Sequence, residues 1–569
     1  MYILGLQNAA DSGVCLMKDG IVLDAVNEER FNRIKLAGGW PERSLAYVLD
    51  RHGLTLDDID CFAYGWHGGT TNNSDYIIRF TDRLLAETAH GHPDAPEIIR
   101  QRVFVENDRD AMVRNDFDTK MTELGISPDR IVYLDHHMTH AWSAYAFSPY
   151  EESFVFTLDG RGDRKSGSVS FADPKNGVQE HDYLISAFDG LGFLYGQVTH
   201  QLGYTPHRHE GKVTGLAAHG DPNKTLPLFN RLISFEDDSI RARIGLYKPF
   251  YTNLQPELKA AFDAHTREDL AAGVQKHCEN LIARWVETWM KKIDRPDVRN
   301  VCLAGGIFGN VRINQIVGDL PGVDNVYIFP HMGDGGLPMG AVAYANFLKT
   351  GHAKHDMPTA YLGPEYSNAE IEKVLSRYQG RIDVELMNDK VARIADDLRN
   401  DRVVGYFDNR MEYGPRALGA RSMMYHARDN SVNEWLNKRL SRTEFMPFAP
   451  VTPQEYAAES YIGWREQDVC AHFMTKTYDC TDAFKKDHPA VAHVDGTARP
   501  QIVTREMNGD YYSIVKAYCD ATGDRAVINT SFNRHEEPIV CSPEDAVESL
   551  LQNTSDVLSV GDYRITLPG

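Results

Sequence analysis

The stretch SFVFTLDGRGDRKSGSVSFADPKNG (Ser153–Gly177) decides the fold. It contains an apolar run that ends at Asp159, a turn rich in glycine and charge, and a second run in which apolar residues alternate. This order predicts two antiparallel strands joined by a turn. The N-terminus repeats the pattern: YILGLQ is followed by a turn that contains Asp11 and then by SGVCLMKDG. An acidic residue after the first strand of each copy indicates a duplicated β-rich unit.

Helical patterns follow both copies, for example PERSLAYVLDRHG and DLAAGVQKHCENLIARWVETWMKKI. Strands with interleaved helices, repeated twice, predict an α/β domain of two related lobes. Two further segments, NVCLAGGIFGNVRINQ and FPHMGDGGLPMGAVAYA, each read as a strand, a glycine-rich turn and a helix. Turns of this kind direct backbone N–H groups at phosphates, so they predict a nucleotide site.

Bulk properties exclude several classes of protein. A chain of 569 residues is too long for one hydrophobic core. Its formal charge of −21 argues against a nucleic-acid partner. No apolar run approaches the roughly 20 residues that span a bilayer, and the N-terminus lacks the basic region of a signal peptide, so we expect no membrane partner. Eight scattered cysteines without a C-x-x-C pair favour a reduced, cytoplasmic location. The irregular stretch Lys349–Asn368 predicts a boundary between domains 1–355 and 356–569.

A histidine cluster lies in DHHMTHAWSAY. His136 and His140 are four residues apart and would share one face of a helix. Alone, the pair could be a first helical turn whose imidazoles bind nearby carbonyls. Two aspartates support a metal site. Asp159 has no basic partner in its own strand, and Asp334 lies among glycines. Two imidazoles and two carboxylates suit Fe²⁺, Zn²⁺ or Mn²⁺.

Arginines are concentrated in the C-terminal third, in NRMEYGPRALGARSMMYHAR, NKRLSRTEFMPFAP, HVDGTARPQIV and INTSFNRHEEP. Any one of them could be solvated or paired with a carboxylate. As a group, in a chain this acidic, they favour a site for phosphate-bearing anions, because guanidinium forks match phosphate oxygens.

Several of these motifs, in this order, resemble the O-carbamoyltransferases of the NodU/CmcH family: DHHMTHAWSAY, LDGRGD, EGKVTGLAAHG, LAGGIFGNVRIN and GDGGLPMGA. The resemblance covers nearly the whole chain. It implies an N-terminal actin/hexokinase-like duplicated α/β domain, similar to the tRNA threonylcarbamoyladenosine transferase, and a C-terminal YrdC-like α/β domain. It further implies that carbamoyl phosphate and ATP give carbamoyl adenylate in the second domain. The carbamoyl group then passes to a hydroxyl of a sugar, an aminoglycoside or another natural product, as in antibiotic biosynthesis.

The resemblance also implies a set of site residues and cofactors. The favoured metal is Fe²⁺, and its ligands would be His136, His140, Asp159 and Asp334. The nucleotide at the transfer site would be lined by Lys212, Gly305, Gly306, Asn310, Gly333, Gly335 and Gly336. Carbamoyl phosphate and ATP, with Mg²⁺, would be bound by Arg416, Arg421, Lys438, Arg442, Arg499, Asn529, Ser531, Asn533 and Arg534.

The chain departs from the family pattern in two places. Ala10 stands where many members have a histidine before the aspartate of the first hairpin. If that histidine deprotonates or holds the acceptor, Asp11 and His209 are the candidates for its role here. Lys35 matches a family lysine near the transfer site but could be a solvated helix-end residue. Met446 stands where an arginine is frequent. Two other functions stay open: a small-molecule kinase of the actin/hexokinase type, and a non-catalytic module that binds nucleotide or carbamoyl phosphate.

Overall fold

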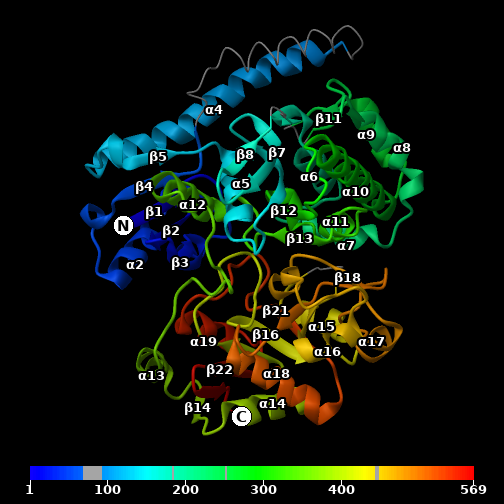
Figure 1. Ribbon diagram of the computed structural model, residues 1–569. Coiled ribbons are helices and arrows are strands. Elements are labelled where there is room, and N and C mark those ends of the chain that lie inside the picture. The colour runs from blue at the N-terminus through cyan, green and yellow to red at the C-terminus, as the bar shows by residue number, and fades with distance from the viewer. Residues whose placement is uncertain (68–92, 182–184, 250–252, 443–446, 569) are drawn as a thin grey trace. The chain divides into compact units, whose positions relative to one another are not determined.

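A computed structural model describes residues 1–67, 93–181, 185–249, 253–442 and 447–568. The chain forms two compact units, which we treat separately. The first comprises Met1–Ile21, Gly39–Pro41 and Val48–Asp356, and the second Val22–Gly38, Glu42–Tyr47 and Met357–Gly569. Both units combine strands and helices, so the predicted two-domain α/β class is confirmed (Figure 1). The segment Val22–Gly38, which contains Lys35, is grouped with the second unit although it lies near the N-terminus of the sequence.

The predicted duplication is visible in the strand order of two sheets. One sheet has the order β3-β2-β1-β4-β5 and the other β8-β7-β6-β12-β13. In each sheet, one strand (β1 or β6) pairs antiparallel with the next strand in sequence (β2 or β7) and parallel with a later strand (β4 or β12). That later strand is parallel to the edge strand (β5 or β13). The bounds of the first set are β1 Tyr2–Gln7, β2 Gly13–Lys18, β3 Ile21–Asn27, β4 Cys61–Tyr64 and β5 Ile131–Tyr133. Those of the second are β6 Ser153–Gly162, β7 Lys165–Asp173, β8 Gly177–Glu180, β12 Asn300–Ala304 and β13 Asn325–Ile328.

Two central helices, α5 (His136–Ala146) and α12 (Leu337–Thr350), exchange places between the sheets. Helix α5 follows β5 but packs on β6, β7 and β12, whereas α12 follows β13 but packs on β1, β2 and β4. The helices also contact each other closely: a Cβ added at Gly340 would lie 2.0 Å from the carbonyl oxygen of Thr139. This exchange brings the loop before α12 to the first turn of α5.

Further helices cover the rest of the first unit. Helix α10 packs on α6, α7, α8 and α11, and its buried Trp285 meets Phe156 of β6 edge-on, with ring centroids 5.1 Å apart. On α4, Phe117 stacks on Tyr64 of β4 at 3.8 Å. The bounds are α4 Ala95–Glu123, α6 Leu191–Gln201, α7 Glu210–Ala217, α8 Leu226–Leu232, α9 Pro256–Asp263, α10 Arg267–Lys292 and α11 Val311–Gly318, with the short strands β9 Ile185–Ser186, β10 Ile233–Glu236 and β11 Ser239–Ala242.

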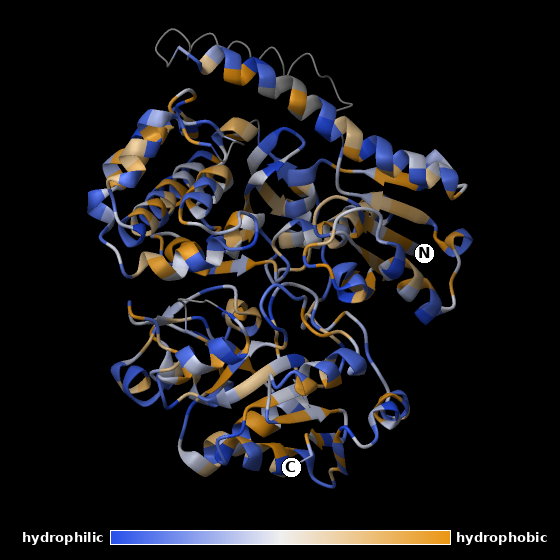
Figure 2. Ribbon diagram, turned by 180° about the vertical axis from the view of Figure 1, so that it is seen from behind, coloured by the Kyte–Doolittle hydropathy of each residue, from blue (hydrophilic) through white to orange (hydrophobic). Residues whose placement is uncertain are grey.

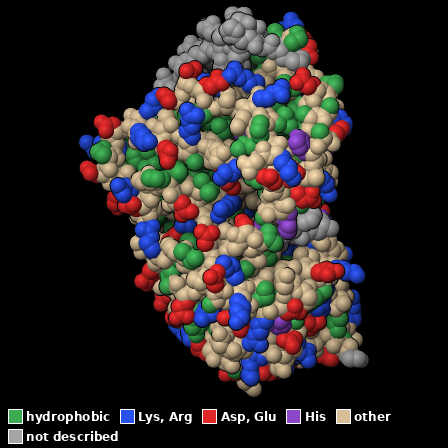
Figure 3. Space-filling view, turned by 90° about the vertical axis from the view of Figure 1, so that its right-hand side faces the viewer, with side chains coloured by type: hydrophobic (Ala, Val, Ile, Leu, Met, Phe, Trp, Pro, Cys, Tyr) green, Lys and Arg blue, Asp and Glu red, His purple; other side chains and the backbone are tan. Residues whose placement is uncertain are grey.

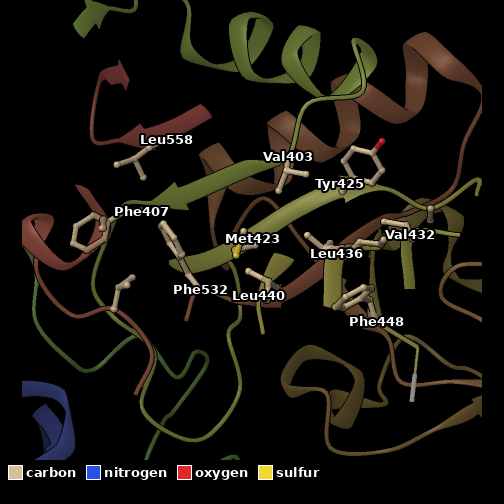
Figure 4. Packing of buried hydrophobic residues seen from close by; sticks show 14 of the residues in the cluster. Val403, Phe407, Met423, Tyr425, Val432, Leu436, Leu440, Phe448, Phe532 and Leu558 are labelled. Atoms are coloured by element: carbon tan, nitrogen blue, oxygen red, sulfur yellow. The ribbon is translucent and has the colours of Figure 1, made fainter. Parts of the chain in front are cut away.

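The second unit is built on an eight-stranded mixed sheet with helices on both faces. Successive residues of its strands point to opposite faces, as strand geometry requires. Phe407, Met423 and Tyr425 therefore join one core cluster (Figure 4), while Tyr406 and Met424 join the other. The order is β14 (Asp383–Leu386), β23 (Tyr563–Thr566), β22 (Val557–Val560), β15 (Val404–Phe407), β16 (Arg421–His426), β21 (Val527–Ser531), β17 (Ala449–Pro453) and β20 (Gln501–Val503).

Helices α13 (Asn368–Leu375), α15 (Val432–Arg439) and α19 (Pro543–Leu551) contribute to the first of these clusters. Helices α14 (Lys390–Arg399) and α18 (Gly509–Thr522) contribute to the second, and Ile394 and Leu398 of α14 are buried in it. The remaining elements are α1 (Glu29–Asn32), α2 (Glu42–His52), α16 (Gln454–Ser460), α17 (Asp482–Asp487), β18 (Tyr478–Asp479) and β19 (Thr497–Ala498).

The side-chain distribution is that of a folded chain with water-facing surfaces. Hydrophobic residues concentrate in the strands of both units (Figure 2), and on the face shown in Figure 3 acidic and basic side chains are intermixed. All eight cysteines are buried and none forms a disulfide. Among the described helices, none is both long and apolar enough to cross a lipid bilayer.

Candidate metal and phosphate sites

Four side chains that are far apart in the sequence converge in the first unit. One ligand atom from each of His136, His140, Asp159 and Asp334 lies within 4.8 Å of the others. Nε2 of His140 is 3.2 Å from Oδ2 of Asp159 and 3.6 Å from Oδ1 of Asp334. Nε2 of His136 is 3.7 and 3.6 Å from the same two oxygens. The sequence pattern named these four residues, and the fold brings all of them together.

The cluster is assembled from three elements. Both histidines lie on the first turn and a half of α5, whose N-terminal backbone N–H groups at His137 and Met138 donate to the cap residue Asp135. Asp159 lies near the end of β6, where the register to β7 shifts, and Asp334 begins the turn that leads into α12.

Burial and mutual hydrogen bonding set the protonation of the cluster. Burial would lower the pKa of His140, but its hydrogen bonds to Asp159 and Asp334 prevail and raise the pKa to about 9. Burial would raise the pKa of Asp159, yet the close approach of His136 and His140 holds that pKa well below its usual range. The third histidine does not join: Nδ1 of His137 is 3.0 Å from the hydroxyl of Thr157, and burial keeps its pKa well below the ordinary value.

These residues fit a divalent cation. The imidazole of His136 is fully shielded from solvent, and neither of its ring nitrogens has a hydrogen-bond partner in the described part of the chain. Buried polar atoms normally have partners, so an imidazole in this state is suited to bind a metal ion. Two nitrogens and two carboxylate oxygens form the borderline donor set that Fe²⁺, Zn²⁺ and Mn²⁺ accept.

Gly162 leaves room for one of the imidazoles, and this leads to a prediction. A Cβ at position 162 would lie 2.1–2.6 Å from three ring atoms of His136. We expect Gly162→Ala to displace the ring and weaken metal binding about 10- to 100-fold, as loss of a ligand's support commonly does. Metal titration of the purified protein measures this. Gly309→Ala, at a position where a Cβ would meet nothing within 4 Å, is the control; equal affinities of the two variants would contradict the prediction.

The glycine-rich turns expected at a nucleotide lie beside the cluster. Gly305 has a φ of +103°, a conformation that L side chains rarely adopt, and a Cβ there would be 2.3 Å from the carbonyl oxygen of Leu158. A Cβ at Gly306 would lie 3.0 Å from Oδ1 of Asp159. Gly333, Gly335 and Gly336 flank Asp334 in the turn before α12. At Gly333 a Cβ would meet nothing within 4 Å, whereas at the other four glycines protein atoms already occupy that space.

Asn310 and Lys212 occupy the neighbouring helices. The side chain of Asn310 caps α11, and its amide contacts Thr214 of α7 and Gln275 of α10. Lys212 lies on α7 and is 4% exposed. These contacts tie three helices together, so Asn310 has a structural role whether or not it contacts a nucleotide.

The three candidate catalytic residues lie in different places. Asp11 lies in the turn after β1, the first strand of the first lobe. Its Oδ2 is 3.6 Å from Nε2 of His331. His209 precedes α7, and its Nδ1 accepts the backbone N–H of Thr205 at 3.1 Å. Lys35 belongs to the second unit, as described above. Of the three, Asp11 lies against the turn that contains Asp334, because a Cβ at Gly335 would be 2.3 Å from its Oδ2.

In the second unit, the loop from Glu412 to Arg421 is held from several sides. Oε1 of Glu412 accepts the backbone N–H groups of Leu418, Ala420 and Arg421 at 2.8, 2.7 and 3.0 Å. The side chains of Tyr361, Gln501, Asn508 and Asn529 donate to carbonyls of Ala417, Leu418 and Gly419. Arg416 therefore projects from an anchored loop; burial lowers the pKa of its guanidinium to about 10, which leaves it charged at neutral pH.

Five of the predicted phosphate residues lie in three separate places. Arg442 donates to the side chains of Thr530, Ser531 and Asn533, so the arginine and the Asn/Ser turn after β21 form one network. Asn529 pairs with Gln501 at 2.6 Å under the anchored loop. Arg499 lines a small pocket together with Phe448, Thr477 and His493.

Arg421, Lys438 and Arg534 stand apart from this network. Arg421 is fully buried, its two Nη atoms donate to backbone carbonyls of Pro364, Asp408, Asn409 and Ala420, and its guanidinium lies 3.7 Å over the ring of Phe407. Its Nε has no hydrogen-bond partner in the described part of the chain. Lys438 is exposed on α15, and Arg534 donates to Gln552. Met446 lies outside the described residues.

Glu412 supports a prediction about stability. It is 3% exposed, and its removal would leave three buried N–H groups without an acceptor. We expect Glu412→Ala to lower the free energy of unfolding by about 3 kcal/mol and to weaken phosphate binding, because the loop that carries Arg416 loses its anchor. Urea unfolding measures the first effect. Glu434→Ala, at an exposed position on α15, should change stability by less than about 0.5 kcal/mol. A Glu412 variant as stable as the control would contradict the assignment.

Sequence reasoning missed Glu412 and His331. Glu412 precedes the glycine and proline of its loop, and nothing in the sequence distinguishes it from a solvated glutamate. His331 had a signal, because it stands three residues before Asp334 in FPHMGDGG.

Comparison with known proteins adds independent information. The family model described as the carbamoyltransferase N-terminus matches residues 2–343, and that of the carbamoyltransferase C-terminus matches residues 395–566. Nodulation protein NolNO of Sinorhizobium fredii is 31% identical, with 98% of this chain and 78% of that protein covered. Nodulation protein U of Rhizobium tropici is 24% identical, with 94% and 91% covered. A solved activator of the 2-hydroxyisocaproyl-CoA dehydratase from Clostridium difficile is 13% identical over 61% of this chain and 94% of that chain, with a TM-score of 0.33.

Proposed function

Because this chain belongs to the carbamoyltransferase family, we propose that it is an ATP-dependent O-carbamoyltransferase that works in two half-reactions. In the first, carbamoyl phosphate and ATP give carbamoyl adenylate in the second unit. In the second, the carbamoyl group passes to a hydroxyl of a sugar, an aminoglycoside or another natural product in the first unit. A nucleotide carrier gives the small carbamoyl group a large handle, whose binding energy can position it for attack.

The first half-reaction needs cations around phosphate. One water converts carbamoyl phosphate into carbamate and inorganic phosphate; a carbamate oxygen then attacks the α-phosphorus of ATP, and pyrophosphate leaves. Arg416, Arg442 and Arg499 are the arginines we assign to these anions, since guanidinium groups bind phosphate oxygens in pairs. Arg442 also holds Ser531 and Asn533, whose hydroxyl and amide can bind phosphate or ribose. ATP would bring Mg²⁺.

The second half-reaction needs a place for the adenylate and for developing negative charge. We assign a divalent metal, with Fe²⁺ favoured over Zn²⁺ and Mn²⁺, to His136, His140, Asp159 and Asp334. When bound, such an ion acts as a Lewis acid toward carbonyl and phosphoryl oxygens. The turns at Gly305–Gly306 and Gly333–Gly336 can bring backbone N–H groups to the nucleotide without side-chain interference. The attacking hydroxyl must also lose a proton to a base, for which Asp11 and His209 are the candidates.

The convergence of two imidazoles and two aspartates in one buried cluster is the observation that carries the proposal. A kinase of the actin/hexokinase type would account for the two lobes of the first unit but not for the anchored, arginine-bearing loop of the second. A binding module would account for both sites without turnover.

One assay separates the three functions. The purified protein is incubated with ATP, Mg²⁺, Fe²⁺ and carbamoyl phosphate, and the nucleotides are resolved by chromatography. We expect pyrophosphate and AMP to form only when carbamoyl phosphate is present. ADP formation would support the kinase instead, and binding without turnover would support the module. A mass-shift screen of hydroxyl compounds, which looks for an added carbamoyl group, then identifies the acceptor.

A further inference from the structure

Each lobe of the first unit has an aspartate near the end of its first strand, and each aspartate lies close to a histidine. Asp159 lies near the end of β6, the first strand of the second lobe, against His136 and His140 at the start of α5. Asp11 follows the first strand of the first lobe and lies against His331, in the loop that leads to α12. Since α5 and α12 exchange between the lobes, Asp11–His331 is the topological counterpart of the Asp159–histidine contacts.

The two side chains of this second pair lie within ion-pair distance. Oδ2 of Asp11 and Nε2 of His331 are 3.6 Å apart, and Gly335 passes between them: a Cβ there would lie 2.3 Å from each. Gly335 directly follows the metal-ligand candidate Asp334, so the pair borders the proposed cluster. The neighbouring residue Ala10 has no ionisable group, and the imidazole at Asp11 comes instead from the other lobe.

The two members of the pair differ in exposure. The side chain of Asp11 is 16% exposed, whereas that of His331 is 6% exposed. Asp11 also has a φ of +54°, a backbone conformation that is uncommon for residues other than glycine. The carboxylate is therefore the member that can reach a ligand, and the imidazole lies behind it.

We propose that Asp11 accepts the proton of the attacking hydroxyl and that His331 is the positioning residue that holds the Asp11 carboxylate in place. This inference rests on the proposed function. In the step, the hydroxyl oxygen forms a bond to the carbamoyl carbon, its proton moves to Asp11, and the bond from that carbon to the AMP oxygen breaks, so that AMP leaves with the electron pair. A positioned base of this kind contributes about 10²- to 10⁴-fold to the rate.

The test compares two nucleophiles that differ in their need for a base. Water must lose a proton as it attacks, whereas hydroxylamine is nucleophilic as the neutral molecule. The holoenzyme is incubated with ATP, carbamoyl phosphate and hydroxylamine. Hydroxyurea reports attack by hydroxylamine, and AMP formed beyond the hydroxyurea reports hydrolysis.

We expect His331→Gln and Asp11→Asn to lower hydrolysis about 100-fold while hydroxyurea formation stays within about threefold of the unmodified protein. His355→Gln is the matched control: it replaces another buried histidine of the same unit, one that contacts the carbonyl of Gly20, and should leave the ratio of the two products unchanged. Thermal melting of each variant shows whether it is folded.

Three results would overturn the assignment. Equal losses toward both nucleophiles would make the pair structural only, and unchanged hydrolysis in both variants would leave it without a role. Loss in Asp11→Asn alone would remove His331 from the step. Failure of the proposed function looks different, because the unmodified protein would then release no pyrophosphate in response to carbamoyl phosphate.

Discussion

Replacement of His140 by alanine is expected to abolish carbamoyl transfer and to leave pyrophosphate release intact. His140 is 1% exposed and contacts both aspartates of the cluster, at 3.2 and 3.6 Å. Its loss removes one of two nitrogen ligands, so the protein should lose its metal, and transfer should fall about 10³-fold, as it does when an electrostatic stabiliser of an acyl-transfer step is removed. The adenylate is formed by arginines of the second unit, which the substitution does not touch.

The two half-reactions can be measured in one sample. Pyrophosphate release reports the first, and hydroxyurea formed from added hydroxylamine reports the second. His200→Ala, at an exposed position on α6, is the control and should change neither. A parallel loss of pyrophosphate release and transfer in His140→Ala, with the fold intact, would contradict the assignment of the cluster to transfer alone.

Replacement of Arg499 by alanine should have the opposite pattern. Arg499 lines a pocket with Thr477 and His493, and we assign its guanidinium to a phosphate oxygen of a substrate. Without it, pyrophosphate release should fall at least 10²-fold, because a charge-assisted bond to the anion is lost in a partly buried place. Chemically prepared carbamoyl adenylate should restore transfer to nearly the unmodified rate.

The control for this experiment is Arg505→Ala, an exposed arginine of the same unit. It should keep full pyrophosphate release. If added carbamoyl adenylate fails to restore transfer in Arg499→Ala, the arginine serves both half-reactions and the separation of the two sites is wrong.

The metal-ligand candidates could be named from the sequence because local rules determine them. Two histidines four residues apart share a helix face, and an aspartate after a buried strand lies at the edge of a sheet. What the sequence did not contain was the exchange of α5 and α12 between the lobes. That tertiary arrangement is what brings Asp334, and not only Asp159, to the histidines, and it also pairs Asp11 with His331.

The arginines show the limit of motif reasoning more sharply. Arg416 and Arg421 are five residues apart in one motif, yet the guanidinium of Arg421 is mostly used to bind backbone carbonyls such as those of Asp408 and Pro364. Whether an arginine meets a carbonyl or a ligand depends on which loops fold against it. Glu412 was missed for the same reason, since its three backbone partners come from a loop whose shape no local pattern predicts.

The most direct test of the metal centre is an anomalous diffraction experiment on crystals of the protein loaded anaerobically with Fe²⁺. We expect an anomalous peak at the iron edge that lies about 2.0–2.2 Å from a ring nitrogen of His136 and of His140 and from a carboxylate oxygen of Asp159 and of Asp334. A map without a peak among these four side chains, from protein that still transfers carbamoyl groups at full rate, would contradict it.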